Sequence, residues 1–303
     1  MDYNLLNVVT SKSEFAAMFL LRKKKYHGTN KEIAKKWRDC VVSELNWTKS
    51  ENQVGAKDGE AGGYYVQAQG FPRRGYMKPT KPHEGAARSA RAAREKIASD
   101  LAHDLGLPLP PAVLATRSDT PPGCEATVVV TLVMYPAQHY WEQVKAQALP
   151  EGPGGLALAS VYSQCSPMLP FNTWVRQMDH GDHPNNIIWG YDPQNLADSQ
   201  LIFLDYSYSL GHDNSWNGDG WKQITWSPFP QALQTHMDDD KLIEAAARIA
   251  GYDPKRVDEI VRRIPDNYLD GAQKDNIVTS LIGRMPLVMR AMEQNLAEGR
   301  SGG

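Results

Sequence analysis

Two segments of the chain carry side chains that suit metal binding and proton transfer. The first, DHGDHPNNIIW at residues 179–189, holds two aspartates, two histidines and two asparagines before an apolar run. The second, LIFLD at residues 201–205, has the pattern of a short buried strand that ends in Asp205. Magnesium prefers oxygen ligands, so Asp205 and Asn186 are expected to bind Mg²⁺. Asp179 is the candidate to accept a proton from a substrate hydroxyl group.

Two charged residues earlier in the chain complete this set. Lys78 stands in GYMKP at the end of a β-like run, where a strand lysine can reach a phosphate group. Glu95 lies in the helix predicted to follow, where it can pair with Lys78. Taken singly, each residue is more simply interpreted as a solvated surface residue. Together with the two later segments, they supply what phosphoryl transfer from ATP requires: a cation, magnesium ligands and a carboxylate beside the attacking hydroxyl.

The segment at 179–189 has two other interpretations. His180, Asp182 and His183 form a short cluster of the kind that binds a transition metal, but no further His or Cys stands at a typical ligand spacing. An Asx-rich turn, whose side chains only satisfy backbone groups, is the structural alternative. The upstream and downstream charged residues favour the magnesium–phosphate interpretation.

Several patterns predict the elements that position these residues. YYVQAQ and RRGYMKP are two β-like runs, and ATVVVTLVMY at residues 126–135 is the clearest buried strand. A helix is expected from Gly85 to Leu105, with Gly106 as its stop signal. Its apolar stripe consists of Ala90, Ala93, Ile97, Leu101 and Leu105. Residues 239–296 are expected to be mostly helical.

The N-terminal region is predicted to contain two helices, at residues 11–21 and 30–45. In the second, Ile33, Trp37, Val41 and Leu45 recur every fourth residue. The lysines of residues 22–36 suit a solvated helical face, or a basic arm that touches a protein partner. Residues 48–63 are polar and glycine-rich, as expected of a loop.

This order of elements predicts an α+β fold with two lobes. The N-lobe, residues 1–136, is rich in strands and has one long helix, and the C-lobe, residues 137–303, is mostly helical. The cleft is expected at their junction, near residues 135–140. Met134 and Tyr135, at the end of the last N-lobe strand, are therefore expected to bind the nucleotide with Lys78 and Glu95.

Composition excludes some classes of function. The chain has 303 residues, 41% of them hydrophobic and 22% charged, as in ordinary globular proteins. A formal net charge of -2 argues against nucleic-acid binding through bulk positive charge. No apolar run approaches the roughly 18 residues that would span a membrane. Cys40, Cys124 and Cys165 are widely spaced, which favours reduced thiols and a cytoplasmic location.

Four segments together resemble the HipA-like kinases and, more distantly, the phosphatidylinositol kinases. They are GYMKP, AREKIASDLAHDLGLPLPP, WVRQMDHGDHPNNIIW and LIFLDYSYSL, and the tail around LIGRMPLVMRAM is also similar. The resemblance implies a two-lobed protein-kinase-like fold and ATP as the phosphate donor. It implies Lys78 as the phosphate-binding lysine, Glu95 as its partner and Asp179 as the catalytic aspartate. It also implies Asn186 and Asp205 as Mg²⁺ ligands, with a protein Ser/Thr hydroxyl as acceptor, which leaves open transfer to the chain itself.

The sequence departs from that family at several points. His180 stands where an arginine usually follows the catalytic aspartate. HGDHPNN is also similar to the loop of aminoglycoside and choline kinases, but one residue short; on that alignment Asp182 would be the base. Asn185 competes with Asn186 as the metal ligand. No orthodox glycine-rich fingerprint is present, and the glycines of residues 55–63 suit either a phosphate-covering loop or a linker.

Two alternative functions follow from these departures. The aminoglycoside-kinase-like loop suits a small-molecule or lipid kinase. Trp216, Trp221 and Trp226 would then line the acceptor pocket, although core packing is the other role of such residues. His180 and the missing glycine fingerprint suit a pseudokinase that serves as a binding module.

Overall fold

The computed structural model describes residues 35–50, 63–68, 73–78, 88–116, 127–141, 162–192, 195–212 and 216–297, apart from residues 36, 44 and 136. The helix predicted at residues 11–21 lies outside these residues, as do nearly all of the lysine-rich stretch, the glycine-rich segment and Cys124. Among the described helices, none combines the length and the apolar character needed to cross a membrane.

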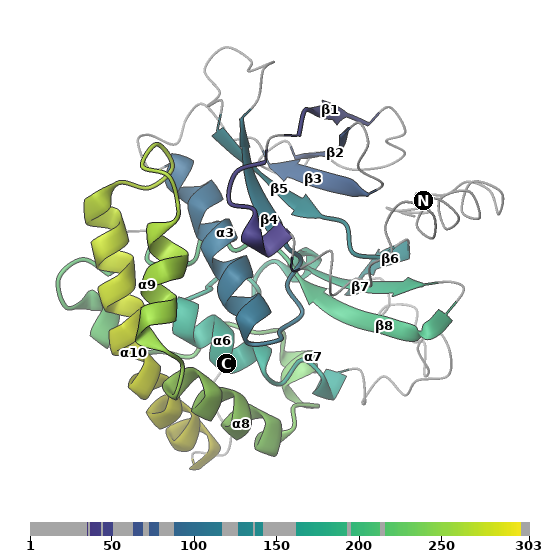
Figure 1. Ribbon diagram of the computed structural model, residues 1–303. Helices are drawn as coiled ribbons and strands as arrows, with labels where there is room; N and C mark the ends of the chain where they lie inside the picture. Colours follow the sequence, from purple (N-terminus) through teal and green to yellow (C-terminus); the bar gives the residue numbers. More distant parts are fainter. Residues whose placement is uncertain are drawn as a thin grey trace.

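The N-terminal half contains a five-stranded antiparallel sheet with the order β1-β2-β3-β5-β4 (Figure 1). Its strands are β1 (Trp47–Lys49), β2 (Tyr64–Ala68), β3 (Arg74–Lys78), β4 (Ala112–Thr116) and β5 (Thr127–Leu132). The strands predicted around YYVQA, RGYMK and TVVVTL are therefore confirmed. Side chains alternate along β3, so Met77 enters a small core with Val66 and Val130, while Lys78 lies on the opposite face.

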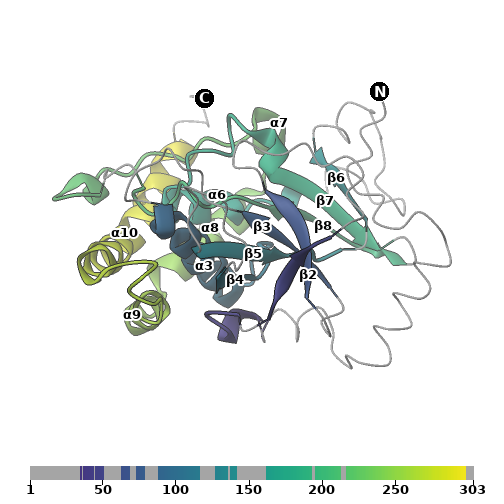
Figure 2. The same ribbon diagram turned by 90° about the horizontal axis from the view of Figure 1, so that it is seen from above.

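Helix α3 (Arg88–Asp104) packs against β4 and β5 (Figures 1 and 2). The five residues of the predicted stripe are all buried. Gly106 adopts a φ of 71°, which favours glycine, and the helix ends just before it. The prediction of this helix and of its stop signal is confirmed.

The predicted helix over residues 30–45 is wrong beyond residue 39. The chain is helical at 37–39 and then runs beside β4, where Val42 forms a parallel bridge with Leu114. Leu45 is 40% exposed instead of packing with Trp37. The β-branched valines suit a strand edge, and this distant pairing overrides the local helical period.

The remaining strands form a second sheet, with β7 (Ile187–Asp192) between β6 (Ala137–Tyr140) and β8 (Asn195–Phe203). β8 contains the first three residues of the strand predicted at LIFLD and ends two residues before Asp205. Pairing of Ile187 with Phe203 brings the start of β7 beside the end of β8. This register places the two chemically interesting segments next to each other.

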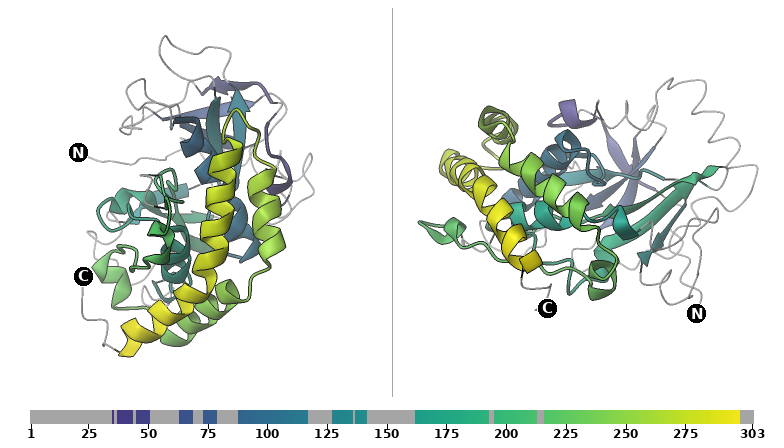
Figure 3. Two further views of the ribbon diagram at one scale, coloured as in Figure 1. Left: turned by 90° about the vertical axis from the view of Figure 1, so that its left-hand side faces the viewer. Right: turned by 90° about the horizontal axis from the view of Figure 1, so that it is seen from below.

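The C-terminal half is mostly helical, as predicted. Its helices are α6 (Met168–Val175), α7 (Gln231–Gln234), α8 (Asp239–Ala250), α9 (Pro254–Arg262) and α10 (Gly271–Ala297), with single 3₁₀ turns η2 (Pro184–Asn186) and η3 (Gly220–Lys222). α10 packs against α6, α8 and α9, and α9 also touches α3 (Figure 3). One apolar core runs from α3 through α6 to α10, so the two halves are joined by continuous packing.

Candidate active site

Lys78 brings three of the predicted residues together. Its Nζ lies 3.2 Å from both carboxylate oxygens of Glu95 and 3.2 Å from Oδ1 of Asp205. Lys78 ends β3 on the face toward α3, Glu95 comes from α3, and Asp205 follows β8. Three separate elements therefore converge on one ammonium group.

The charges of this group depend on one another. Burial would lower the pKa of Lys78, but the charges of Asp205 and Glu95 outweigh burial and raise it. Burial would likewise raise the pKa of Asp205, yet Lys78 and hydrogen bonds from Ser207 hold it below its usual value. Burial and the charge of Asp205 raise the pKa of Glu95, against the opposing effect of Lys78. Lys78 and Asp205 therefore form the firmly charged pair of the group.

The backbone at Asp205 is strained. Its φ is 60°, a left-handed conformation that costs a non-glycine residue roughly 1–2 kcal/mol. The side-chain amide of Gln177 donates a hydrogen bond to the Asp205 carbonyl oxygen, and Ser207 Oγ donates to Asp205 Oδ1 over 2.5 Å. The Gln177 side chain also accepts from the amide of Asp179. Gln177, which no sequence pattern indicated, thus ties the two segments together.

Asp179 and Asn186 face each other within the first segment. Asn186 Nδ2 donates to Asp179 Oδ2 over 2.9 Å, and the Leu204 amide donates to the Asn186 carbonyl oxygen. Asp182 and Asn185 are exposed. The geometry therefore favours Asp179 over Asp182, and Asn186 over Asn185, as members of the site.

The electrostatic setting of Asp179 suits a proton acceptor. Burial and the charge of Asp205 raise its pKa, while His183, Asn186 and Lys78 oppose that rise. His183 Nε2 lies 3.2 Å from Asp179 Oδ1, and its own side chain is 61% exposed.

His180 has a structural role. It is fully buried; its Nε2 lies 2.8 Å from the Leu204 carbonyl oxygen, and its Nδ1 lies 2.9 Å from Asn172 Nδ2. A carbonyl only accepts, so these partners assign the proton to Nε2. Tyr206 Oη donates to the Oδ1 of Asn172 over 2.7 Å. Both His180 nitrogens are thus engaged, and the described residues contain no group of three or more His, Cys, Asp or Glu side chains that could hold a metal ion.

The folded state is expected to lose stability as pH decreases, because His180 is buried in its neutral form. Burial lowers the pKa of His180 to about 4, from 6.5. The folded state thus binds a proton on His180 less readily than the unfolded state does. The contribution of the neutral imidazole to folding stability is therefore complete above pH 6.5 and is lost as pH falls toward 4. From pH 7.5 to 5 the loss is about 2 kcal/mol in the free energy of unfolding. Urea unfolding of the wild type and of His180→Gln should show a flatter pH dependence in the variant, and equal slopes would contradict this assignment.

The predicted nucleotide contacts Met134 and Tyr135 lie between the two sheets. Tyr135 is 7% exposed, and its ring packs so closely on Gly190 that a Cβ there would lie 2.5 Å from it. Ile188 and Ile202 complete this small cluster, and Met134 packs partly buried against it. The Tyr135 side chain therefore belongs to the core, and nucleotide binding by the main chain of these residues stays a prediction.

The three tryptophans proposed to line an acceptor pocket pack in or against the core. Trp216 is fully buried, with the Arg284 guanidinium 5.4 Å from its ring. Trp221 lies against Gly283 of α10, and Trp226 packs partly buried on the same core. Their role is core packing, the other interpretation of these residues.

Arg284 is a buried cation that sequence patterns did not indicate. Its side chain, from α10, donates to the carbonyl oxygens of Thr173 and Trp174 at the end of α6, at 2.5 and 2.9 Å. It also donates to the carbonyl oxygens of Trp221 and Gln223. Burial lowers the pKa of Arg284 to about 10, so it remains protonated at neutral pH. Arg284 thus fixes the end of the helix that leads into the Asp179 segment.

Comparison with known proteins supports the fold. No protein-family model matches the chain, and no curated protein shows significant sequence similarity to it. The structure of the proinflammatory kinase CtkA from Helicobacter pylori is similar, with a TM-score of 0.57 and 12% identity, over 87% of this chain and 100% of that one. The PknI kinase domain from Mycobacterium tuberculosis aligns with a TM-score of 0.36 and 16% identity, over 83% of this chain and 97% of that one. The chain has a two-lobed α+β protein-kinase-like fold, with a strand-rich N-lobe and a mainly helical C-lobe.

Proposed function

We propose that the chain is an ATP- and Mg²⁺-dependent phosphotransferase, specifically a HipA-like serine/threonine protein kinase that also phosphorylates itself. The observation that carries the proposal is the convergence of Lys78, Glu95 and Asp205 within 3.2 Å, beside the Asp179–Asn186 pair. The kinase-like fold supports it. We place the boundary between the lobes near residue 136.

The donor set fits magnesium and a nucleotide. Asp205 offers carboxylate oxygens, and Asn186 uses its amide nitrogen on Asp179, which leaves its amide oxygen for a cation. Lys78 offers a positive charge for phosphate oxygens. Bound Mg²⁺ would neutralise negative charge on the phosphates of ATP.

Each protein group then has one task. Glu95 holds Lys78 so that its ammonium group can pair with a phosphate. Asp179 accepts the proton of the attacking hydroxyl, a role that its raised pKa suits. The neutral His180 keeps the Asp179 segment attached to Leu204, directly before Asp205.

Removing the proposed metal ligand should weaken binding of the magnesium complex of ATP. Asp205→Asn is expected to reduce MgATP affinity at least about tenfold, since even indirect supports of metal sites contribute that much. Calorimetric titration with ATP, with and without Mg²⁺, measures the effect. Asp219→Asn, at an exposed aspartate, is the matched control and should bind as the wild type does. Equal Mg²⁺ dependence in wild type and Asp205→Asn would remove Asp205 from the metal site.

The acceptor can be identified with γ-labelled ATP. The protein is incubated with Mg²⁺, Ser/Thr-containing proteins and a panel of small hydroxyl compounds. Label on serine or threonine of protein supports the proposal. Label in small molecules alone would replace it with the small-molecule kinase alternative, and MgATP binding without any transfer would replace it with the binding-module alternative.

A further inference from the structure

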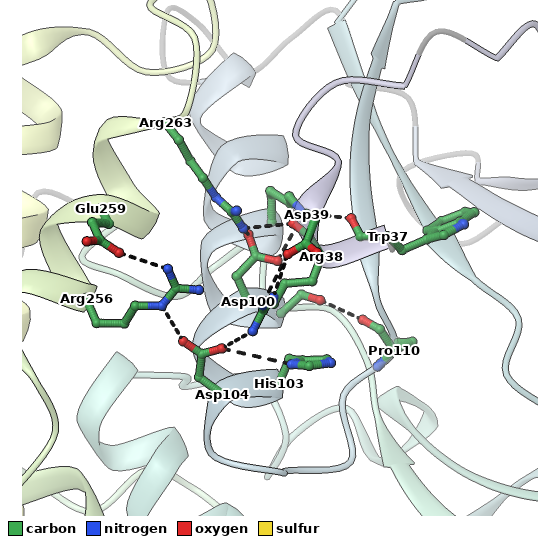
Figure 4. Close-up of polar contacts among 12 residues, drawn as sticks. Trp37, Arg38, Asp39, Asp100, His103, Asp104, Pro110, Arg256, Glu259 and Arg263 are labelled. Atoms are coloured by element: carbon green, nitrogen blue, oxygen red, sulfur yellow. Dashed lines mark hydrogen bonds and ion pairs between the residues drawn. The ribbon is translucent and has the colours of Figure 1, made fainter. Parts of the chain in front are cut away.

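Helix α3 has a second polar face, turned away from the candidate active site. Asp104 lies nine residues after Glu95, which places the two side chains about 180° apart around the helix axis. None of the chemistry proposed above uses Asp104. Its side chain is only 12% exposed, and it lies among the polar contacts drawn in Figure 4.

Asp104 accepts hydrogen bonds from three segments of the chain. Oδ1 accepts from Arg38 Nη1 over 2.5 Å, while Oδ2 accepts from Arg256 Nε over 2.7 Å and from Tyr252 Oη over 2.8 Å. Arg256 belongs to α9, Tyr252 to the turn between α8 and α9, and Arg38 to the segment before β1. Burial would raise the pKa of Asp104, but the hydrogen bonds from Arg256 and Tyr252 lower it. A single carboxylate of the N-lobe helix thus joins the C-lobe and the N-terminal segment.

A second buried charged group repeats this connection one turn earlier. Asp100, 1% exposed, accepts from Lys96 Nζ over 3.0 Å and from the Arg263 guanidinium (Figure 4). Lys96 and Arg263 also donate to the Arg38 carbonyl oxygen, at 3.1 and 2.9 Å. Buried ion pairs contribute little net stability compared with apolar packing. These pairs connect α3 to the end of α9 through Asp100 and Arg263.

The position of Glu95 depends on the tilt of α3. At 1.5 Å per residue, Glu95 stands about 13 Å along the axis from Asp104, so a tilt of roughly 10° about that end would move Glu95 by about 2 Å. Such a shift exceeds what the 3.2 Å contacts with Lys78 can absorb.

We propose that Asp104 is a positioning residue for phosphoryl transfer. Together with Arg38 and Arg256, it clamps the C-terminal half of α3 to α9 and so holds Glu95 against Lys78. This inference rests on the function proposed above. In this way the α3–α9 contact, although far from the reacting atoms, affects the rate of phosphoryl transfer.

Kinetics of the full chain test the clamp. Asp104→Asn is expected to lower kcat/KM for transfer from ATP by about 10- to 100-fold, because misplacement by an ångström has effects of that size. Arg256→Gln removes one of the three donors from a partly exposed position, so it should fold and show a smaller loss in the same direction. Arg262→Gln, also on α9, is the matched control: it breaks exposed ion pairs with Asp258 of α9 and Asp275 of α10, and should be as active as the wild type.

A double-mutant cycle distinguishes positioning from general destabilisation. If Asp104 acts through Glu95, Asp104→Asn should cause little further loss in a Glu95→Gln background. If the two losses multiply in full, Asp104 acts by another route and the proposal is overturned.

Hydrogen exchange tests the clamp without relying on activity. In Asp104→Asn, backbone amides of residues 91–98 should exchange faster than in the wild type, although they lie more than one turn from the substitution. Unchanged exchange there would overturn the clamp. If the wild type transfers no phosphate, the proposed function is wrong. The exchange rates of residues 91–98 still decide whether Asp104 holds α3 in place.

Discussion

Asp179→Asn is expected to lower kcat for phosphoryl transfer by about 10²- to 10⁴-fold, the usual contribution of a general base. The asparagine keeps the shape of the side chain and can still meet the Asn186 amide, but it cannot accept the proton of the hydroxyl. Affinity for MgATP should change little, because Lys78 and Asp205 are untouched. Steady-state kinetics with labelled ATP, together with calorimetry, separates the two quantities.

Asp182→Asn is the matched control for this substitution. Asp182 lies three residues further along the same segment, but it is exposed. Its variant should retain nearly full activity. A large loss in Asp182→Asn with a small loss in Asp179→Asn would move the base to Asp182, as the aminoglycoside-kinase alignment implies.

Arg284→Met should cause the largest loss of stability of the substitutions considered. Arg284 is 1% exposed and satisfies four carbonyl oxygens at the end of α6 and in the loop around η3. Methionine occupies similar space but leaves those oxygens without a donor. The free energy of unfolding is expected to fall by about 3–5 kcal/mol, as measured by urea unfolding at pH 7.5.

Arg290→Met provides the comparison on the same helix. Arg290 is exposed, so its replacement should alter the free energy of unfolding by less than about 0.5 kcal/mol. If Arg284→Met lowered the free energy of unfolding as little, its buried hydrogen bonds would not stabilise the end of α6 that leads into the Asp179 segment.

Much of the scaffold follows from local patterns in the sequence. The β-branched run of β5 and the apolar stripe of α3 both depend on neighbours in the chain, and both were predicted within a few residues. Asp205 could be placed at a strand end for the same reason. Lys78, Glu95 and Asp205 come from two separate sheets and a helix, so their meeting also depends on how these elements pack.

The features that sequence reasoning missed depend on distant partners. Val42 pairs with Leu114, 72 residues away, and this contact ends a helix that the local period favours. The bonds of Gln177 to Asp205, of Arg284 to Thr173 and of Asp104 to Arg256 also join residues far apart in the chain. No local signal marks such residues, because a buried arginine or glutamine has the same sequence surroundings as an exposed one.

The measurement that tests the central claim most directly is transfer of label from γ-labelled ATP, in the presence of Mg²⁺, by the wild type and by Asp205→Ala. We predict that the wild type moves label to protein serine or threonine and that the variant does not. Equal transfer by both proteins, or no magnesium-dependent binding of ATP by the wild type, would contradict the assignment of Lys78, Glu95 and Asp205 to a phosphotransfer site.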